Sequence, residues 1–344
     1  MMTSGPVASS ADLFRRLSWQ STVPLEVRLA EHEPGAGSGA DRYYMYPPRH
    51  AYLPLLIPEI RENLVEIALD DQQLAETNEA EWWFEEDPGD AVGFAPQGAC
   101  RWHWPLDLIH LHSIITHPAP GASSNGPGPS APGPSKPTFQ PLRLLLHLSN
   151  PPADKLMLPN TVESCKANYM NQLREADFVR WRNTSRVTNM RRPDLDAGWD
   201  GIVHDDYDMY MRMASRLIPL PHSVPAPTNP STRPAITDPN GKQPESSYAV
   251  RALPIKVYLP DGAPVVQEVV PPLGADGQPT TVLSVLQQHL PLLFPSSSKI
   301  PYPMALPIAQ GVELPPEAEL AWLSSSVCGA DGWLRIGIRL IAEN

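Results

Sequence analysis

Residues 255–272 read IKVYLPDGAPVVQEVVPP, and this stretch decides the fold class that we predict for the end of the chain. Its first five residues alternate between apolar and more polar side chains, and Asp261-Gly262 then supplies a turn. A second run, rich in valine, continues to Val270. Alternation with a period of two, interrupted by Asp-Gly, is typical of a β-hairpin.

The chain after this hairpin supplies the other elements of a small mixed sheet. Leucines at helical spacing predict a helix in residues 280–294, which Pro291 should end or kink. Residues 302–315 predict a short strand and turn, 316–327 a short helix, and 333–341 a last, alternating strand. Hairpin, helix, strand, short helix and strand follow one another in the order of a ubiquitin-like β-grasp module.

The amino-terminal part repeats this order of elements with insertions. Alternating apolar residues in PLEVRLAE (24–31) and PLRLLLHLSN (141–150) predict two strands. Between them, residues 53–69 and 106–115 carry apolar residues typical of helices. We therefore predict an α+β fold with two ubiquitin-like β-grasp modules that bracket a helix-rich region.

The middle of the chain is predicted to be helical. Two apolar stripes at spacings of three and four residues indicate helices that pack on each other. The first stripe consists of Tyr169, Leu173, Ala176 and Val179, and the second of Val203, Tyr207, Tyr210, Ala214 and Leu217. In the helix YMNQLREADFVRWR (169–182), Arg174 lies off the stripe on the side of Phe178 and Trp181. An exposed face of arginine and aromatic residues often meets a partner.

Proline usage marks the domain boundaries. Of the 344 residues, 43 are proline, and many lie in residues 118–137, which are also rich in Gly and Ser, and in residues 222–247. Neither stretch can bury enough apolar surface to offset its ordering entropy, so we predict both to be disordered. The predicted domains are an N-terminal helix or tail (1–20), module A (21–159), a helix-rich region (160–221), a linker (222–247) and module B (248–344).

The composition argues against several classes of function. The formal net charge is −12, whereas a general nucleic-acid binder needs a basic surface. The three cysteines, Cys100, Cys165 and Cys328, are far apart, so we expect neither disulfides nor a thiolate zinc site. No run approaches the roughly 18 apolar residues of a spanning helix, and the first residues lack the apolar core of a secretory signal. We expect a soluble protein of a reducing, intracellular compartment.

Three patterns that could indicate chemistry have simpler structural explanations. QGACR (97–101) departs from a caspase signature, because its glutamine is displaced and Trp102 replaces the glycine. GAGSGA (35–40) leads into a strand, so the helix N-terminus that would hold a pyrophosphate is missing. No thiolate or carboxylate grouping accompanies the histidines at the end of module A, which are His103, His110, His112 and His117. We expect no catalytic residue, metal or cofactor.

Six motifs resemble, in order, those of the autophagy protein 5 family. EWWFEED (81–87) and RWHWPLDLI (101–109) resemble the family's W-F-E strand and its W-x-Y/W-P turn before a helix. LREADFVR (173–180) resembles its K-E-A-D segment. QGVELP, AWLSSSV and WLRIGIRLI resemble its closing G-I/V-E, W-L and last-strand motifs. The resemblance runs from about residue 12 to the end, outside the two proline-rich stretches, and indicates a fungal-like member.

The resemblance implies a scaffold that is not itself an enzyme. Family members are modified on one lysine by the ubiquitin-like autophagy protein 12, and they bind the N-terminal helix of autophagy protein 16. The complex acts like an E3 ligase and promotes transfer of autophagy protein 8 to phosphatidylethanolamine during autophagosome formation. The resemblance further implies a cytoplasmic protein recruited peripherally to the phagophore membrane. The apolar rims of the two modules and the helical region should form the groove for the partner helix.

The acceptor position departs from the family pattern. The family's acceptor lysine stands immediately before E-A-D, where this chain has Arg174. A guanidinium stays protonated and its lone pairs are delocalised, so it is not an acceptor in acyl transfer. Either another lysine substitutes, with Lys166 about 12 Å earlier along the helix and Lys155 in the preceding loop as candidates, or the partner binds noncovalently. A third reading is a change in the sequence itself.

A run of cations follows the acceptor position. Residues 180–192 carry five arginines and no acid, namely Arg180, Arg182, Arg186, Arg191 and Arg192. Such a run is either a solvated helix end or a contact for anionic lipid headgroups or an acidic partner, where each cation contributes about 1 kcal/mol. The alternative to the autophagic scaffold is a ubiquitin-like adaptor of another pathway, and binding of the autophagy protein 16 helix would separate the two.

Overall fold

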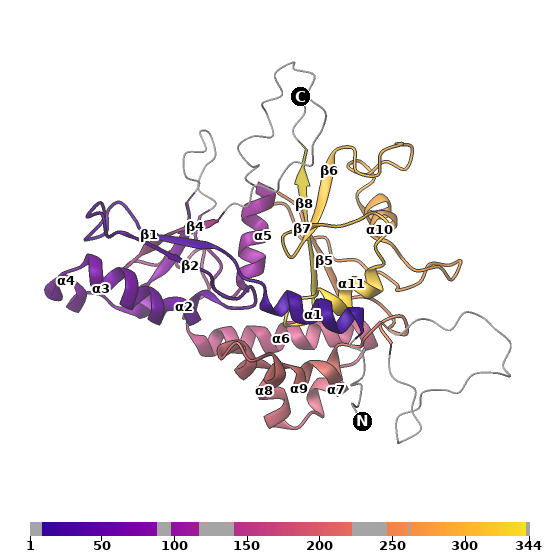
Figure 1. Ribbon diagram of the computed structural model, residues 1–344, viewed down its shortest axis with the longest axis horizontal. Helices are drawn as coiled ribbons and strands as arrows, with labels where there is room; N and C mark the ends of the chain where they lie inside the picture. The colour runs from indigo at the N-terminus through magenta and orange to yellow at the C-terminus, as the bar shows by residue number, and fades with distance from the viewer. Residues whose placement is uncertain (1–8, 88–97, 117–140, 222–245, 261, 342–344) are drawn as a thin grey trace, which may run out of the picture. The chain divides into compact units, whose positions relative to one another are not determined.

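The computed structural model describes residues 9–87, 98–116, 141–221, 246–260 and 262–341. The chain forms two compact units, and its elements are labelled in Figure 1. Unit A comprises residues 21–169, 259–263 and 337–344, and unit B comprises residues 1–20, 170–258 and 264–336. The predicted insertion 118–137 and most of the predicted linker 222–247 lie outside the described residues. At the end of the linker, Ser246 forms an isolated β-bridge with Leu220. The next residue, Ser247, is 2% exposed, so both serines belong to the folded part.

Unit A contains a four-stranded mixed sheet. Its strands are β1 (Leu25–Leu29), β2 (Arg42–Met45), β3 (Trp83–Glu86) and β4 (Leu142–His147), in the order β2-β1-β4-β3. The central strands β1 and β4 run parallel, whereas each edge strand is antiparallel to its neighbour. A parallel central pair flanked by antiparallel edges is the arrangement of a β-grasp sheet.

The alternation predicted for β1 and β4 sets the two faces of this sheet. The inward side chains, Leu25, Val27, Leu29, Leu142, Leu144 and Leu146, are at most 1% exposed. Each of them contributes roughly 1.5–3 kcal/mol by leaving water. The opposite face carries Glu26, Arg28 and Arg143, and Glu26 pairs with Arg42 and Arg143, both at 3.3 Å. One face of the sheet is therefore apolar and the other is charged.

Unit A also contains helices. They are α2 (Leu53–Ile60), a π-helical turn η1 (Arg61–Val65), α3 (Glu66–Ala68), α4 (Asp71–Ala75), a 3-10 turn η2 (Glu79–Glu81) and α5 (Leu106–Thr116). Figure 1 shows α2, α3 and α4 along one side of the strands, with α5 apart from them. Ile60, Leu64 and Val65 are fully buried beneath the strands. Asp70 and Gln73 form a capping box that begins α4.

Unit B contains the second sheet. Its strands are β5 (Ile255–Tyr258), β6 (Ala305–Ala309), β7 (Val312–Glu313) and β8 (Leu334–Leu340), in the order β5-β8-β6-β7, and β8 continues into residues of unit A. The predicted helix after the hairpin is α10 (Val282–His289), which ends before Pro291. Thr281 begins it through a capping box with Ser284.

The second arm of the predicted hairpin is not a regular strand. Val257 and Val266 exchange two backbone hydrogen bonds of 2.9 Å, and Leu253 bridges Val270, so the two arms lie antiparallel. No continuous ladder forms between these bridges in the described part of the hairpin. Pro264 and Pro271 flank the segment, and proline has no backbone donor for a ladder.

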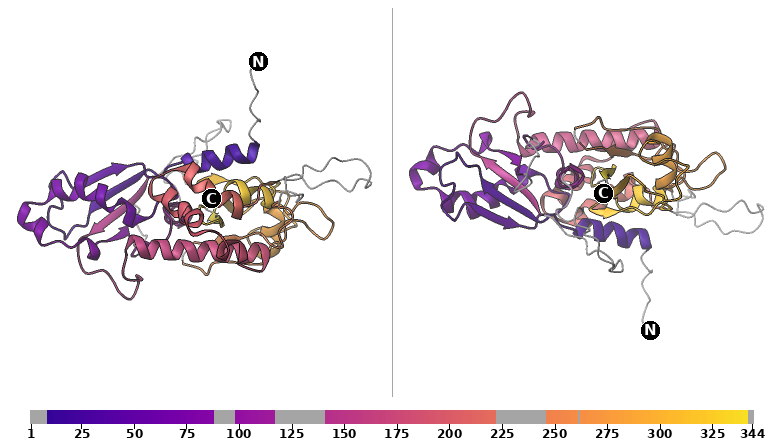
Figure 2. Two further views of the ribbon diagram at one scale, coloured as in Figure 1. Left: turned by 90° about the horizontal axis from the view of Figure 1, so that it is seen from below. Right: turned by 90° about the horizontal axis from the view of Figure 1, so that it is seen from above.

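The helical region consists of α6 (Val162–Trp181), α7 (Ser185–Thr188), α8 (Arg192–Val203) and α9 (Tyr207–Leu217). Figure 2 shows α6 as one uninterrupted helix in both views. In α9, Tyr210, Met213, Ala214 and Leu217 are buried. Val203 does not belong to that stripe, because it ends α8 and is 41% exposed.

Gly201 permits the close packing of α8 against α9. A Cβ at residue 201 would lie 2.6 Å from the backbone nitrogen of Tyr210 and 2.9 Å from the carbonyl oxygen of Asp206. Backbone atoms cannot move aside as a flexible side chain does, so this position requires glycine.

Helix α1 (Ser10–Gln20) is part of unit B and packs on α11 (Leu320–Ser326). Arg15 is 6% exposed and donates from Nε and Nη2 to the carbonyl oxygen of Ser325, at 3.0 and 2.7 Å. Trp19 stacks on Tyr210 with ring centroids 4.5 Å apart. Among the described residues, no helix has the length and apolar character needed to cross a membrane.

Candidate functional site

Helix α6 has a buried side and an exposed side around Arg174, where the sequence predicts the surface for a partner. Tyr169, Leu173 and Ala176 are at most 1% exposed, as the predicted stripe requires. Arg174 is exposed and donates from Nη1 to Asn171 Oδ1 at 3.2 Å. Phe178, one turn later, is 47% exposed. Arg174 and Phe178 thus form a pair of exposed side chains, which we call the α6 docking pair.

Lys256 of β5 and Trp333, which immediately precedes β8, hold the same turn of α6. Lys256, in β5, donates from Nζ to Gln172 Oε1 at 2.7 Å and lies 3.6 Å from Glu175 Oε2. Its Nζ is also 4.0 Å from the centre of the Trp333 ring. Trp333 is fully buried and donates from Nε1 to the carbonyl oxygen of Gln172 at 3.0 Å. We call Gln172, Lys256 and Trp333 the α6 clamp.

The clamp contains Lys256, a lysine close to Arg174 in the fold that the sequence analysis did not single out. Burial lowers the pKa of Lys256, although the charge of Glu175 opposes this shift. Lys256 is 82 residues after Arg174 in the sequence, so no local pattern connects them. Since Lys256 is largely buried and committed to Gln172, we assign it a structural role.

The two lysines predicted as substitute acceptors occupy different settings. Lys155 is exposed in the loop after β4, where its backbone nitrogen donates to the carbonyl of Pro152 at 3.0 Å. Lys166 is half-buried on α6, two turns before Arg174. Of the two, Lys155 is the more accessible to an acylating enzyme.

The structure removes Arg180 from the predicted surface run of arginines. Arg180 is 2% exposed and donates from Nη2 to the carbonyl oxygen of Gly332 at 2.6 Å. Burial lowers the pKa of its guanidinium, while the thiol of Cys328 and the carboxylate of Asp177 oppose the shift. Arg180 therefore anchors α6 within unit B, and its prediction as a lipid or partner contact is wrong.

The other four arginines of the run remain at the surface. Arg182 and Arg191 are exposed, and Arg182 has the left-handed backbone φ of 60° that ends α6. Arg186 lies 3.8 Å above the ring of Trp181, and Arg192 pairs with Asp196 at 3.4 Å. These four residues form what we call the α7 basic patch, although Asp196 offsets part of its charge.

The surroundings of Cys100 and Cys165 do not favour the nucleophilic thiolate that a thiol hydrolase needs. Burial raises the pKa of Cys100 well above its usual value, and the nearby charges of Glu86 and Glu85 add to this shift. Burial likewise raises the pKa of Cys165 to about 12. Both thiols are neutral at physiological pH, and it is the thiolate that acts as a nucleophile.

Partly buried histidines in and before α5 are expected to make the stability of the protein sensitive to acid. Burial lowers the pKa of both His103 and His112 to about 4, and the charge of Arg101 contributes. His110 is 2% exposed and lies 3.4 Å from Arg49 Nη2, whereas His117 lies outside the described residues. His103 and His112 therefore lie within the fold as neutral rings at neutral pH.

We expect the free energy of unfolding to fall as the pH is lowered from 6.5 to 4. An unfolded histidine titrates near 6.5, above the folded values, so the unfolded state binds more protons in this window. Allowing for solvent screening at half-exposed His103, the pair should contribute roughly 1–2 kcal/mol per pH unit. Urea unfolding at pH 6.5, 5.5 and 4.5 measures the slope. The double variant His103→Gln/His112→Gln should flatten it, and an equal slope in the variant would contradict the assignment.

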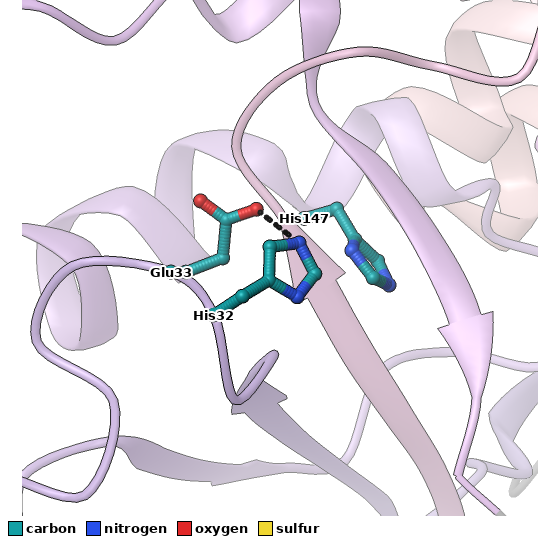
Figure 3. Close-up of side chains that lie close together, drawn as sticks. All are labelled: His32, Glu33 and His147. Carbon is teal, nitrogen blue, oxygen red and sulfur yellow. Dashed lines mark ion pairs between the residues drawn. The ribbon is translucent and has the colours of Figure 1, made fainter.

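Two histidines and a glutamate gather at a different place in unit A. His32 and Glu33 follow β1 and His147 ends β4, and donor atoms of the three lie within 4.8 Å of one another (Figure 3). Sequence reasoning did not find this cluster. The available signal was that His32 follows one predicted strand and His147 lies near the end of another, because parallel strands bring their carboxyl ends to the same edge.

Comparison with known proteins places these features in a family. Three profiles match the chain: "Autophagy protein ATG5, UblA domain" over residues 18–112, "Autophagy protein ATG5, alpha-helical bundle region" over 162–220, and "Autophagy protein ATG5, UblB domain" over 252–338. The matches confirm the predicted order of two ubiquitin-like modules around a helical region. The residue boundaries that we predicted between the domains stay predictions.

Individual relatives match over nearly the full length. Autophagy protein 5 of Phaeosphaeria nodorum is 27% identical over 349 residues, covering 96% of this chain and 98% of that protein. Autophagy protein 5 of Penicillium rubens is 26% identical, covering 94% and 95%. The crystal structure of Kluyveromyces marxianus Atg5 matches with a TM-score of 0.64 at 17% identity, covering 95% of this chain and 99% of that one. At that identity, the structural likeness supports the fold alone.

Proposed function

Because the chain belongs to the autophagy protein 5 family, we propose that it is a noncatalytic core subunit of the autophagy protein 12–5–16 complex. In this role it would act in an E3-like manner, promoting transfer of autophagy protein 8 to phosphatidylethanolamine. The observation that carries the proposal is the exposed α6 docking pair at the family's acceptor position. A scaffold needs an accessible surface there and no nucleophile of its own.

We propose further that autophagy protein 12 binds α6 noncovalently. Arg174 supplies a permanent charge and five donors, and Phe178 adds exposed apolar surface beside it. Arginine and aromatic side chains are enriched where interfaces are strongest. The clamp on the same turn holds α6 in place, which lowers the entropy lost on binding. Scaffolding depends on how fully the partner site is occupied, so a tight noncovalent complex suffices.

Two further contacts belong to this proposal. The N-terminal helix of autophagy protein 16 would bind an apolar groove, as amphipathic helices commonly do. The α7 basic patch would contact anionic lipid headgroups and so support peripheral recruitment to the phagophore membrane from the cytoplasm. The offset of Arg192 by Asp196 makes this membrane contact a weak, auxiliary one.

Replacing Phe178 by alanine should weaken binding of autophagy protein 12 by about 30-fold, the loss of a hot spot worth roughly 2 kcal/mol. Co-elution on a native column and titration of the partner measure the change. Phe14→Ala is the matched control, because Phe14 is 44% exposed, close to the 47% of Phe178, but lies on α1.

Noncovalent binding of autophagy protein 12 and membership of the complex can be tested separately. A denaturing gel after reconstitution with the E1-like and E2-like enzymes should show no shifted band for the native chain. A band mapped to Lys166 or Lys155 would mean that the acceptor has moved and would overturn the noncovalent part. Absence of co-elution with autophagy protein 12, and of binding to the autophagy protein 16 helix, would favour an adaptor of another pathway.

A further inference from the structure

The ends of two parallel strands bring His32, Glu33 and His147 together. Leu29, the last residue of β1, pairs in register with Leu146 of β4, so both strands end at the same edge of the sheet. The backbone nitrogen of Ala30 donates to the carbonyl of Leu146 at 3.0 Å, and that of Glu33 to the carbonyl of Ala30 at 2.9 Å. This turn carries His32 and Glu33 back towards the final residue of β4.

The three side chains face one another across this edge. Figure 3 shows the His32 ring between the Glu33 carboxylate and the His147 ring. His32 Nε2 lies 3.3 Å from Glu33 Oε1, and the centres of the two imidazole rings are 5.2 Å apart. The residues offer two imidazole nitrogens and a carboxylate oxygen, all within 4.8 Å.

Glu33 carries a buried charge with little compensation. The residue is 8% exposed, and its Oε1 accepts no hydrogen bond from the described residues. Its ion-pair partner, His32, has a side chain that is 70% exposed and is charged only when protonated. A buried carboxylate oxygen without a hydrogen bond is costly, so a cation at this point would relieve an existing penalty.

His147 is already oriented as a metal ligand. Its Nε2 lies 3.2 Å from Glu85 Oε2, and its ring stacks on Trp83 at 3.8 Å with an angle of 8°. Trp83 is itself fixed by a 2.9 Å hydrogen bond from Nε1 to the carbonyl oxygen of Ser149. A carboxylate that accepts from one imidazole nitrogen holds the tautomer whose other nitrogen, here Nδ1, can bind a metal.

The neighbouring cations do not compete for this cluster. A groove of about 670 Å³ on the charged face of the sheet adjoins it and includes His32 and His147 in its lining. Within the groove, Arg28 forms an ion pair with Asp87 at 2.9 Å. Glu26 forms ion pairs with both Arg42 and Arg143 at 3.3 Å. The arginines are thus matched by other carboxylates, and the groove gives an ion a path from solvent.

We propose that His32, Glu33 and His147 form a site for a divalent transition-metal ion, best suited to Zn²⁺. Two imidazoles and one carboxylate are a donor set that zinc accepts, with water completing a tetrahedral site. Zinc bonds of about 2.0–2.2 Å require the donors to approach one another, and exposed His32 is the residue free to rotate inwards. The ion would join the loop after β1 to the end of β4 and thereby stabilise unit A.

Isothermal titration of the metal-free full chain with zinc chloride at pH 7.5, in a non-chelating buffer, tests the proposal. We expect one equivalent to bind and the Tm to rise with zinc concentration, since the ion binds the folded state. His32→Ala should weaken binding at least tenfold, because loss of an outer-shell partner already costs 10–100-fold. His32 is exposed, so this variant should fold; His204→Ala, at an exposed histidine of unit B, is the matched control and should bind as the native chain does.

Two further readouts separate this site from zinc bound elsewhere. Glu33→Gln keeps the shape of the side chain but removes its charge, and it should also weaken binding at least tenfold. On adding zinc, the ring signals of His32 and His147 should shift together in NMR spectra, whereas that of His204 should not. Absence of zinc binding, or binding that His32→Ala leaves unchanged, would overturn the proposal. None of these results depends on the partners proposed above.

Discussion

Replacing Arg174 by lysine is expected to convert the proposed noncovalent complex with autophagy protein 12 into a covalent one. A lysine amine can lose its proton and attack a thioester, whereas a guanidinium stays protonated with delocalised lone pairs. Position 174 is exposed, and its present side chain donates to Asn171, itself exposed, so the change should leave the fold intact. In the reconstituted reaction, the variant should give a denaturation-resistant adduct in which mass spectrometry locates the isopeptide bond at residue 174.

Arg192→Lys is the matched control for this gain of function. Arg192 is also exposed, with 91% of its side chain accessible, but it lies on α8 away from the docking pair. This variant should give no adduct. Equal adduct formation by Arg174→Lys, Arg192→Lys and the native chain would show that the acceptor lies elsewhere, and peptide mapping would then distinguish Lys155 from Lys166.

Replacing Trp333 by alanine should cost unit B about 3–5 kcal/mol in free energy of unfolding, the usual range for a buried tryptophan. The Trp333 ring is fully buried, its Nε1 donates to the carbonyl of Gln172, and Lys256 rests on its face. The substitution leaves a cavity and frees both polar partners. Because Gln172 and Lys256 hold the turn of α6 next to Arg174, binding of the partner should weaken together with stability.

Urea unfolding of the full chain measures this loss, and two variants make it interpretable. Trp333→Phe keeps most of the apolar volume but loses the hydrogen bond, so it should cost roughly 1–2 kcal/mol. Trp322→Ala removes a half-buried tryptophan that packs edge-on to Phe14 at 5.1 Å, and it should cost less than Trp333→Ala. If Trp333→Ala lowered the free energy of unfolding no more than Trp322→Ala, the α6 clamp would not be what holds α6.

The regular elements followed from the sequence where one interaction dominates. In β4, Leu142, Leu144 and Leu146 alternate and are fully buried, because a strand presents every second side chain to the same face. Helix α10 ends before Pro291, since that residue lacks a backbone donor. The prediction was wrong where neighbours compete: prolines broke up the second hairpin arm, and Val203 ended α8 instead of joining the stripe of α9.

The residues of the candidate sites also fall into those that the sequence could predict and those that it could not. The exposed position of Arg174 could be predicted, since helical periodicity alone assigns it to the side opposite the buried stripe. The burial of Arg180 could not, because it depends on the carbonyl of Gly332, 152 residues later in the chain. Lys256 beside Gln172 and His147 beside Glu33 were missed for the same reason.

Local periodicity, turn residues and short motifs in the chain are therefore enough to specify most of its elements, their order, the family and the arginine at position 174. They act within a few residues, and a backbone with two soft dihedrals per residue responds to them directly. Which side chains hold α6, which arginine is buried and which groups could bind a metal depend on strands that meet only after folding. Hydrogen bonds and charges act through space over a few ångströms, so such contacts between distant segments leave no local pattern to read.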